Sequence, residues 1–64
     1  MNPDQETPLA HSPAGAAKRA SITTRKVYDL IAQGELRSFK LGKRRLIPES
    51  ELQRLIERKL KEAA

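Results

Sequence analysis

The sequence has no cysteine and no tryptophan, and only one histidine, one tyrosine and one phenylalanine among its 64 residues. Without cysteine, neither a disulfide framework nor a thiolate metal site can brace the fold, and a reducing compartment is compatible. Long apolar runs are also missing, and the first 17 residues lack the basic start and apolar stretch of a signal peptide. We therefore expect a cytoplasmic protein with one small domain, a modest core and no membrane segment.

Groups suited to catalysis or metal binding are equally scarce. His11 has no cysteine or second histidine to join it, so we interpret it as a solvated loop residue. Glu49 and Glu51 lie two residues apart at an expected helix start, where carboxylates fit the helix dipole better than acid–base chemistry. Neither Ser12 nor Ser50 has a base nearby in sequence. We predict a protein that is not an enzyme and needs no metal, cofactor or small-molecule ligand.

Positive charge, in contrast, is concentrated in the middle of the chain. The net charge is +5. Residues 1–17 carry −2, residues 18–45 carry nine Lys and Arg against two acids, or +7, and residues 46–64 are neutral overall. Cations that served only solubility would not need this segregation. The distribution is typical of a protein that binds a polyanion.

The N-terminal third predicts a lead-in and one short helix. Residues 1–10 show no hydrophobic period, so we expect a flexible lead-in there and a single domain over residues 11–64. Ser12 suits an N-cap and Pro13 suits the first helical position, which predicts a helix of about eight residues.

A second helix follows after a tight connection. Thr23 is its expected N-cap and Gly34 follows its last turn, where a positive φ is needed. The apolar face comprises Val27, Leu30 and Ile31, and the opposite face comprises Arg25, Tyr28, Asp29 and Ala32, with Lys26 beside it. Two short helices joined in this way are the sequence form of a helix-turn-helix.

The stretch "FKLGKRRLIP" predicts a β-hairpin. Phe39 and Leu41 alternate with polar residues, Gly42 opens a turn of two or three residues, and Leu46 and Ile47 continue the return strand. A two-stranded hairpin is marginal alone, so we expect Phe39 to pack against the helices.

The residues of the turn are cationic. Lys43 lies at the expected tip, followed by Arg44 and Arg45. The pattern does not set the register, so either arginine could share a face with Phe39. The last segment, "PESELQRLIERKLKEAA", predicts a closing helix with Pro48 in its first turn. Its apolar stripe, which we expect to be needed for the core, comprises Leu52, Leu55, Ile56 and Leu60.

The low aromatic content indicates which nucleic acid is bound. Single-strand binders and RNA-recognition sheets stack bases on several aromatic side chains. Double-stranded DNA, with a helix in the major groove and a basic hairpin on the backbone, fits this sequence better. An ordinary amphipathic helix with a solvated charged face is the alternative.

The segment from Ser12 to Ile56 resembles the winged-helix module of phage and mobile-element excisionases, which is related to the MerR-type fold. The shared features are the Ala pair of "AGAA", the helix "TTRKVYDLI", the "GEL" exit, the wing "FKLGKRRLI" and the closing helix "ESELQRLI". Gly15 and Ala20 depart from the pattern, because the family usually has an acid and a larger aliphatic residue there. The implied fold is α+β: two short helices, a two-stranded hairpin wing and a C-terminal helix.

The resemblance also implies which residues contact DNA. The second helix would enter the major groove and the wing would contact phosphates or the adjacent minor groove. The implied set is Thr24, Arg25, Lys26 and Tyr28 in the helix and Lys40, Lys43, Arg44 and Arg45 in the wing, with Lys18 and Arg19 as second-rank phosphate contacts.

We therefore expect an excisionase, or recombination directionality factor. It would bind and bend attachment-site DNA, with neighbouring copies at repeated sites, and direct a separate integrase toward excision in a bacterial host cell. A small winged-helix transcriptional regulator is the first alternative, and a protein-interaction module that docks its terminal helix is the second.

Overall fold

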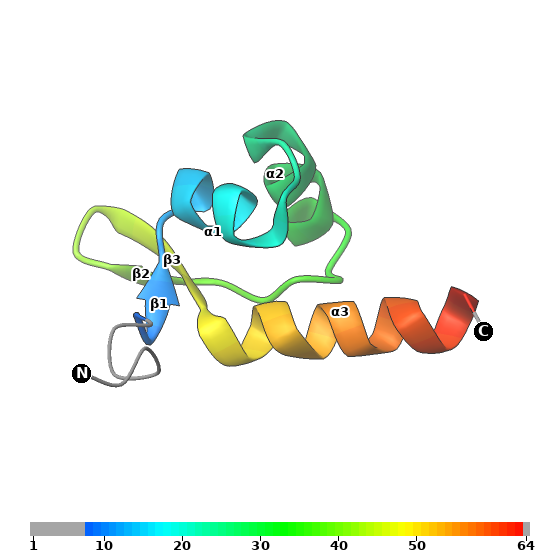
Figure 1. Ribbon diagram of the computed structural model, residues 1–64. Helices are drawn as coiled ribbons and strands as arrows, with labels where there is room; N and C mark the ends of the chain where they lie inside the picture. The colour runs from blue at the N-terminus through cyan, green and yellow to red at the C-terminus, as the bar shows by residue number, and fades with distance from the viewer. Residues whose placement is uncertain (1–7, 64) are drawn as a thin grey trace.

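The computed structural model describes residues 8–63; the segment before residue 8, which includes most of the predicted lead-in, lies outside the described residues. Helices and strands of the described part follow one another as β1 (Ala10–His11), α1 (Pro13–Ala20), α2 (Thr24–Ala32), β2 (Phe39–Leu41), β3 (Arg44–Pro48) and α3 (Glu49–Ala63). Figure 1 shows α1 and α2 above the segment that leads into β2 and α3 below it; α3 starts where β3 ends and runs away from the hairpin tip. This is the predicted α+β winged helix-turn-helix arrangement.

The two short helices begin at the predicted caps. The Ser12 hydroxyl accepts a hydrogen bond from the Gly15 amide at 3.0 Å, and Pro13 is the first residue of α1. The Thr23 hydroxyl accepts from the Lys26 amide at 3.1 Å at the start of α2. Each cap satisfies an amide that has no partner within its helix.

The turn between α1 and α2 is three residues long. Ser21 ends α1 with φ = 60°, in the left-handed region, and its amide donates to the carbonyls of Ala17 and Lys18. The Ile22 amide donates to the Ala17 carbonyl at 2.9 Å, and only three residues separate the end of α1 from the start of α2. This short turn fixes the angle between the two helices. Two helices joined in this way form a helix-turn-helix.

The sheet has three antiparallel strands in the order β1-β3-β2. In the hairpin, Phe39 pairs with Leu46, Lys40 with Arg45 and Leu41 with Arg44, which leaves Gly42 and Lys43 as a two-residue turn. Gly42 has φ = 65°, as the first central residue of a type II′ turn requires. The predicted turn is therefore confirmed, and its register is now set.

Leu36, not Phe39, anchors the segment that leads into the hairpin. Leu36 is 1% exposed, whereas Phe39 is 42% exposed, so the prediction that Phe39 packs into the core is wrong. The pairing of Phe39 with Leu46 places it on the sheet face opposite Ile47, which is fully buried. Core residues come from every helix, from the loop before β2 and from β3: Ala16, Ala17, Val27, Leu30, Leu36, Ile47, Leu52 and Leu55.

Helix α3 contributes less to this core than its apolar stripe predicts. Leu52 and Leu55 are buried, but Ile56 is 47% exposed and Leu60 is 66% exposed. The C-terminal half of α3 extends past the other elements in Figure 1, so few side chains cover it. The expectation that all four apolar residues of this stripe are needed for the core is therefore wrong. Pro48, expected in the first helical turn, instead ends β3 and pairs with Ala10.

His11 is buried, which corrects its interpretation as a solvated loop residue. It is 9% exposed, and its Nε2 lies within hydrogen-bond distance of Glu49 Oε1. An ionised carboxylate only accepts hydrogen bonds, so His11 Nε2 carries the proton and donates. The Glu49 amide also donates to the Leu9 carbonyl at 2.8 Å. Strand β1, which the sequence did not predict, is thus tied to the start of α3.

Candidate nucleic-acid interface

The outward face of α2 presents the predicted helix residues to solvent. Val27 and Leu30 are buried against the core, whereas Thr24, Arg25 and Lys26 are exposed and Tyr28 is 50% exposed. Arg25 lies on the side of the helix opposite the buried pair, with Tyr28 to one side of it. Because a major groove admits a single α-helix, a face of this kind can reach base edges.

The predicted wing residues point in different directions. Lys43 lies in the turn itself, and Arg44 shares the outer sheet face with Leu41 and Phe39. Lys40 and Arg45 lie on the other face. The Arg45 Nη1 donates to the Ser38 hydroxyl at 2.6 Å, so its guanidinium is held in place while its other donors remain available.

Ion pairs divide the cations of the described chain into two groups. Every ion pair involving Lys or Arg uses Arg19 or a residue of α3: Arg54, Arg58 and Lys59. Within residues 8–63, no carboxylate lies within ion-pair distance of the other nine. Eight of these nine lie between residues 18 and 45, in α1, α2, the loop and the hairpin: Lys18, Arg25, Lys26, Arg37, Lys40, Lys43, Arg44 and Arg45.

The two second-rank candidates therefore differ. Lys18 is exposed and forms no ion pair with a described residue. Arg19 donates from Nη2 to Glu49 Oε2 at 3.0 Å and from Nε to Glu49 Oε1 at 3.3 Å. This pair lowers the pKa of Glu49 to about 2, with further hydrogen bonds from Gln53 and His11 opposing the effect of burial. Arg19 has a structural partner and is a weaker candidate for phosphate contact than Lys18.

Glu35 pairs with two cations of α3, Arg58 and Lys59, as Glu49 pairs with Arg19. Lys59 Nζ lies 2.7 Å from Glu35 Oε1, and Arg58 donates to the Glu35 carbonyl at 2.7 Å. The hydrogen bond from Lys59 lowers the pKa of the Glu35 carboxyl below its ordinary value, so it stays ionised near neutral pH. Arg58 and Lys59 of α3 therefore hold the loop that follows α2 in place.

Sequence reasoning missed one residue of the unpaired cationic group. Arg37 is exposed in the loop between α2 and β2, and no described carboxylate pairs with it. Its position between α2 and the hairpin could have indicated it, because a loop that joins two elements on one duplex also lies close to that duplex. We did not name it because it belongs to neither a helical nor a strand pattern.

The helix and the wing form two separate surfaces. In Figure 1 the hairpin tip projects beyond α1 at the end of the molecule away from α2. The molecule measures 35 × 31 × 17 Å. Half a turn of duplex is about 17 Å, since one turn spans about 34 Å. The molecule is thus long enough to place α2 in one groove and the hairpin at the next.

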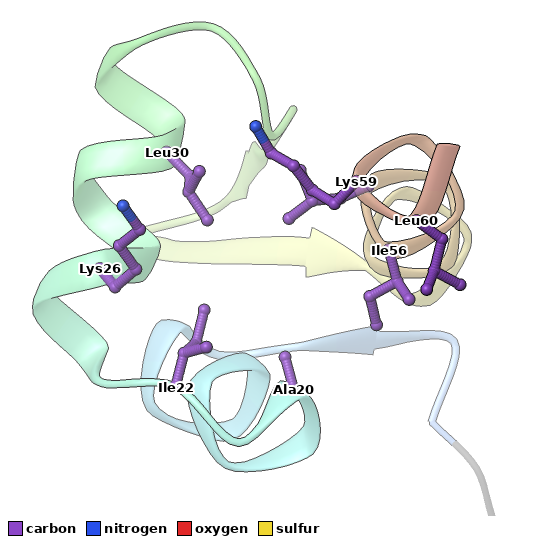
Figure 2. Close-up of a pocket in the computed structure, with 8 residues that line it drawn as sticks. Ala20, Ile22, Lys26, Leu30, Ile56, Lys59 and Leu60 are labelled. Atoms are coloured by element: carbon purple, nitrogen blue, oxygen red, sulfur yellow. The ribbon is translucent and has the colours of Figure 1, made fainter. Parts of the chain in front are cut away.

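An apolar groove of about 420 Å³ lies between the end of α1, α2 and the C-terminal half of α3 (Figure 2). Leu30 and Ile22 lie on one side of it, and Ile56 and Leu60 on the other. Lys26 lines the α2 side, so this residue lies between the groove and the outward face of the helix.

The described part of the chain, residues 8–63, contains no helix that is both long and apolar enough to cross a bilayer. Within the same residues, no three His, Asp or Glu side chains gather where they could hold a metal ion.

The sequence matches a protein family. Neither the curated proteins nor the solved structures include a significant match to this sequence. Residues 12–60, which span both short helices, the hairpin and most of α3, match the family described as "Helix-turn-helix domain". This match covers more than half of the chain. It begins at Ser12, the N-cap of α1, ends within α3, and contains all eight residues of the buried core. The chain belongs to the helix-turn-helix domain family.

Proposed function

We propose that this protein binds double-stranded DNA with α2 in the major groove and the hairpin on the adjacent backbone. The observation that carries the proposal is the division of the cations into two groups. Arg19 and three of the four cations of α3 are paired within the fold, whereas the cations of α2, the loop and the hairpin have no described carboxylate partner. Unpaired cations concentrated in one stretch of a small domain, here residues 18–45, are the electrostatic footprint of a nucleic-acid binder.

The two surfaces have different roles in this proposal. Arg25 and Lys26 lie at the start of α2, the part of a recognition helix that contacts base edges. Lys43 and Arg44 lie at the hairpin tip, where they contact phosphates and carry little sequence information. Thr24 and Tyr28 contribute hydrogen bonds and apolar contact beside Arg25, and Lys40 and Arg45 support the wing from its other face.

We further propose that the protein acts as an excisionase, bending attachment-site DNA so that a separate integrase runs toward excision. Two arguments support this role beside the resemblance. A single module of this size buries about 600–1,000 Å² of protein surface on DNA, at the low end for specific binding. Several copies at directly repeated sites would restore discrimination, and a row of copies that each draw phosphates inward would bend the duplex. A monomer without two-fold symmetry has no need of a palindrome.

Gel-shift titration against duplexes with one, two and three candidate sites tests this role. Apparent affinity should rise steeply with the number of sites, and the multi-site complexes should migrate as bent DNA. Tight, saturable binding to one isolated site, or to an inverted repeat by a dimer stable in solution, would instead favour a small transcriptional regulator. Footprinting on DNA that flanks the gene adds a second readout, because several protected sites within an attachment region fit excision and one site over a promoter fits regulation.

A further inference from the structure

One carboxylate lies among the cations of the α2 outer face. Asp29 follows Arg25 by four residues, so the two side chains project about 40° apart around the helix, one turn from each other. Asp29 is exposed, and no Lys or Arg of residues 8–63 lies within ion-pair distance of it. It belongs to the outward face of the helix and not to its buried side, where Val27 and Leu30 lie.

No contact among residues 8–63 gives this carboxylate a stabilising role. It lies in the second half of α2, where a negative charge opposes the helix dipole. A cation that precedes an acid by four residues is the less favourable order of such a pair, and Arg25 forms no ion pair with it. The Gln33 amide bonds to the backbone carbonyl of Asp29, so no cap depends on the side chain.

The Asp29 carboxylate is also unfavourable near DNA unless it accepts a hydrogen bond from the DNA. Phosphates repel it, and desolvation without a hydrogen bond adds to that penalty. Cytosine presents its N4 amino group in the major groove, and Asp is a side chain that accepts from this group. Ala32, the next residue on this face, is small, so the helix can approach closely enough for a short side chain to reach a base.

We propose that Asp29 is a specificity-determining residue that accepts a hydrogen bond from the N4 amino group of a cytosine in the major groove. This inference rests on the proposed DNA binding by α2. Four helical residues rise about 6 Å and one base pair about 3.4 Å, so the cytosine lies within about two base pairs of the base that Arg25 contacts. Asp29 therefore lowers affinity for random DNA and restores it only at sites with this cytosine.

Selection of bound duplexes from a random pool tests the inference with the wild type, Asp29→Ala and Glu57→Ala. Glu57 is an exposed carboxylate of α3 with no described ion-pair partner, so its variant makes the same change in charge away from α2. Both variants should bind random DNA somewhat more tightly. Only Asp29→Ala should lose the preference for cytosine at one position, by about 5- to 150-fold.

A cytosine analogue that lacks the 4-amino group isolates the contact. Placed at the selected position, it should weaken wild-type binding by the same factor as the Asp29→Ala change, and it should cause no further loss for that variant. An unchanged base preference in Asp29→Ala would overturn the role of Asp29. So would losses of affinity from the protein change and the base change that simply add when both are made. If the wild type itself selects no sequence, the proposed function fails first, so the two failures are distinguishable.

Discussion

Replacing Glu49 by Gln should destabilise the fold at neutral pH by about 2–3 kcal/mol. The carboxylate accepts hydrogen bonds from His11, Arg19 and Gln53 and is 12% exposed. A hydrogen bond to a charged group contributes about 1.5–3 kcal/mol to stability. The Arg19 side chain is half exposed, so solvent screening reduces the contribution of its ion pair with Glu49 to less than about 1 kcal/mol. An amide in place of the carboxylate also turns an N–H toward these donors.

The loss is large for a domain of this size. At about 0.05–0.15 kcal/mol per residue, a chain of 64 residues has a total stability of roughly 3–10 kcal/mol. A change of about 2–3 kcal/mol should therefore lower the Tm by roughly 10–20 °C. Thermal unfolding followed by circular dichroism measures it, with Glu57→Gln as the matched control, since Glu57 is exposed and unpaired among the described residues.

The pH dependence gives the sharper test. Because folding lowers the pKa of Glu49 to about 2, its contribution is fully present above the unfolded pKa of about 4.3 and is lost as the pH falls toward 2. The difference in stability between the wild type and Glu49→Gln should therefore shrink between about pH 4.5 and pH 2. Equal Tm values at pH 7, or a difference that stays constant down to pH 2, would refute the role of this carboxylate in tying β1, α1 and α3 together.

Three further substitutions test the fold by thermal unfolding. Leu36→Ala should cost about 2–5 kcal/mol because Leu36 is fully buried, and Phe39→Ala should cost clearly less because its ring is 42% exposed; the reverse order would restore Phe39 as the anchor. Ser21→Gly should stabilise the protein by about 1 kcal/mol, because Ser21 has φ = 60°, and a lower Tm would contradict this geometry. Thr23→Ala should cost about 1 kcal/mol through loss of the α2 cap, and no change would show that water replaces it.

Local signals predicted the helices and the hairpin well. Ser12 and Thr23 have the short polar side chains that cap helices, and both caps are present in the structure. The two-residue turn needs a positive φ at its first position, and Gly42 supplies it. These features depend on neighbours in sequence, so the sequence pattern is enough to place them.

Burial was harder to predict because it depends on contacts between distant residues. Phe39 and Leu46 are apolar, but their strand register turns them away from Ile47 and the core. His11 is buried because Glu49, 38 positions later, accepts its hydrogen bond. Strand β1 is only two residues long, too short for any alternation to be seen. For the candidate interface, charge clustering indicated which cations to consider, and their contact with DNA stays a prediction; the separation of paired from unpaired cations required the fold.

The most direct test of the account is the salt dependence of binding to a selected site and to random DNA. Arg25→Ala should lose discrimination between the two by about 5- to 150-fold, because it removes a base contact. Arg44→Ala should weaken both about equally and reduce the slope of log affinity against log salt by about one unit. Arg54→Ala is the matched control, since Arg54 pairs with Glu51 on α3 and should leave discrimination and slope unchanged. An intact specific-to-random ratio in Arg25→Ala, or an unchanged slope in Arg44→Ala, would contradict the division of roles between α2 and the hairpin.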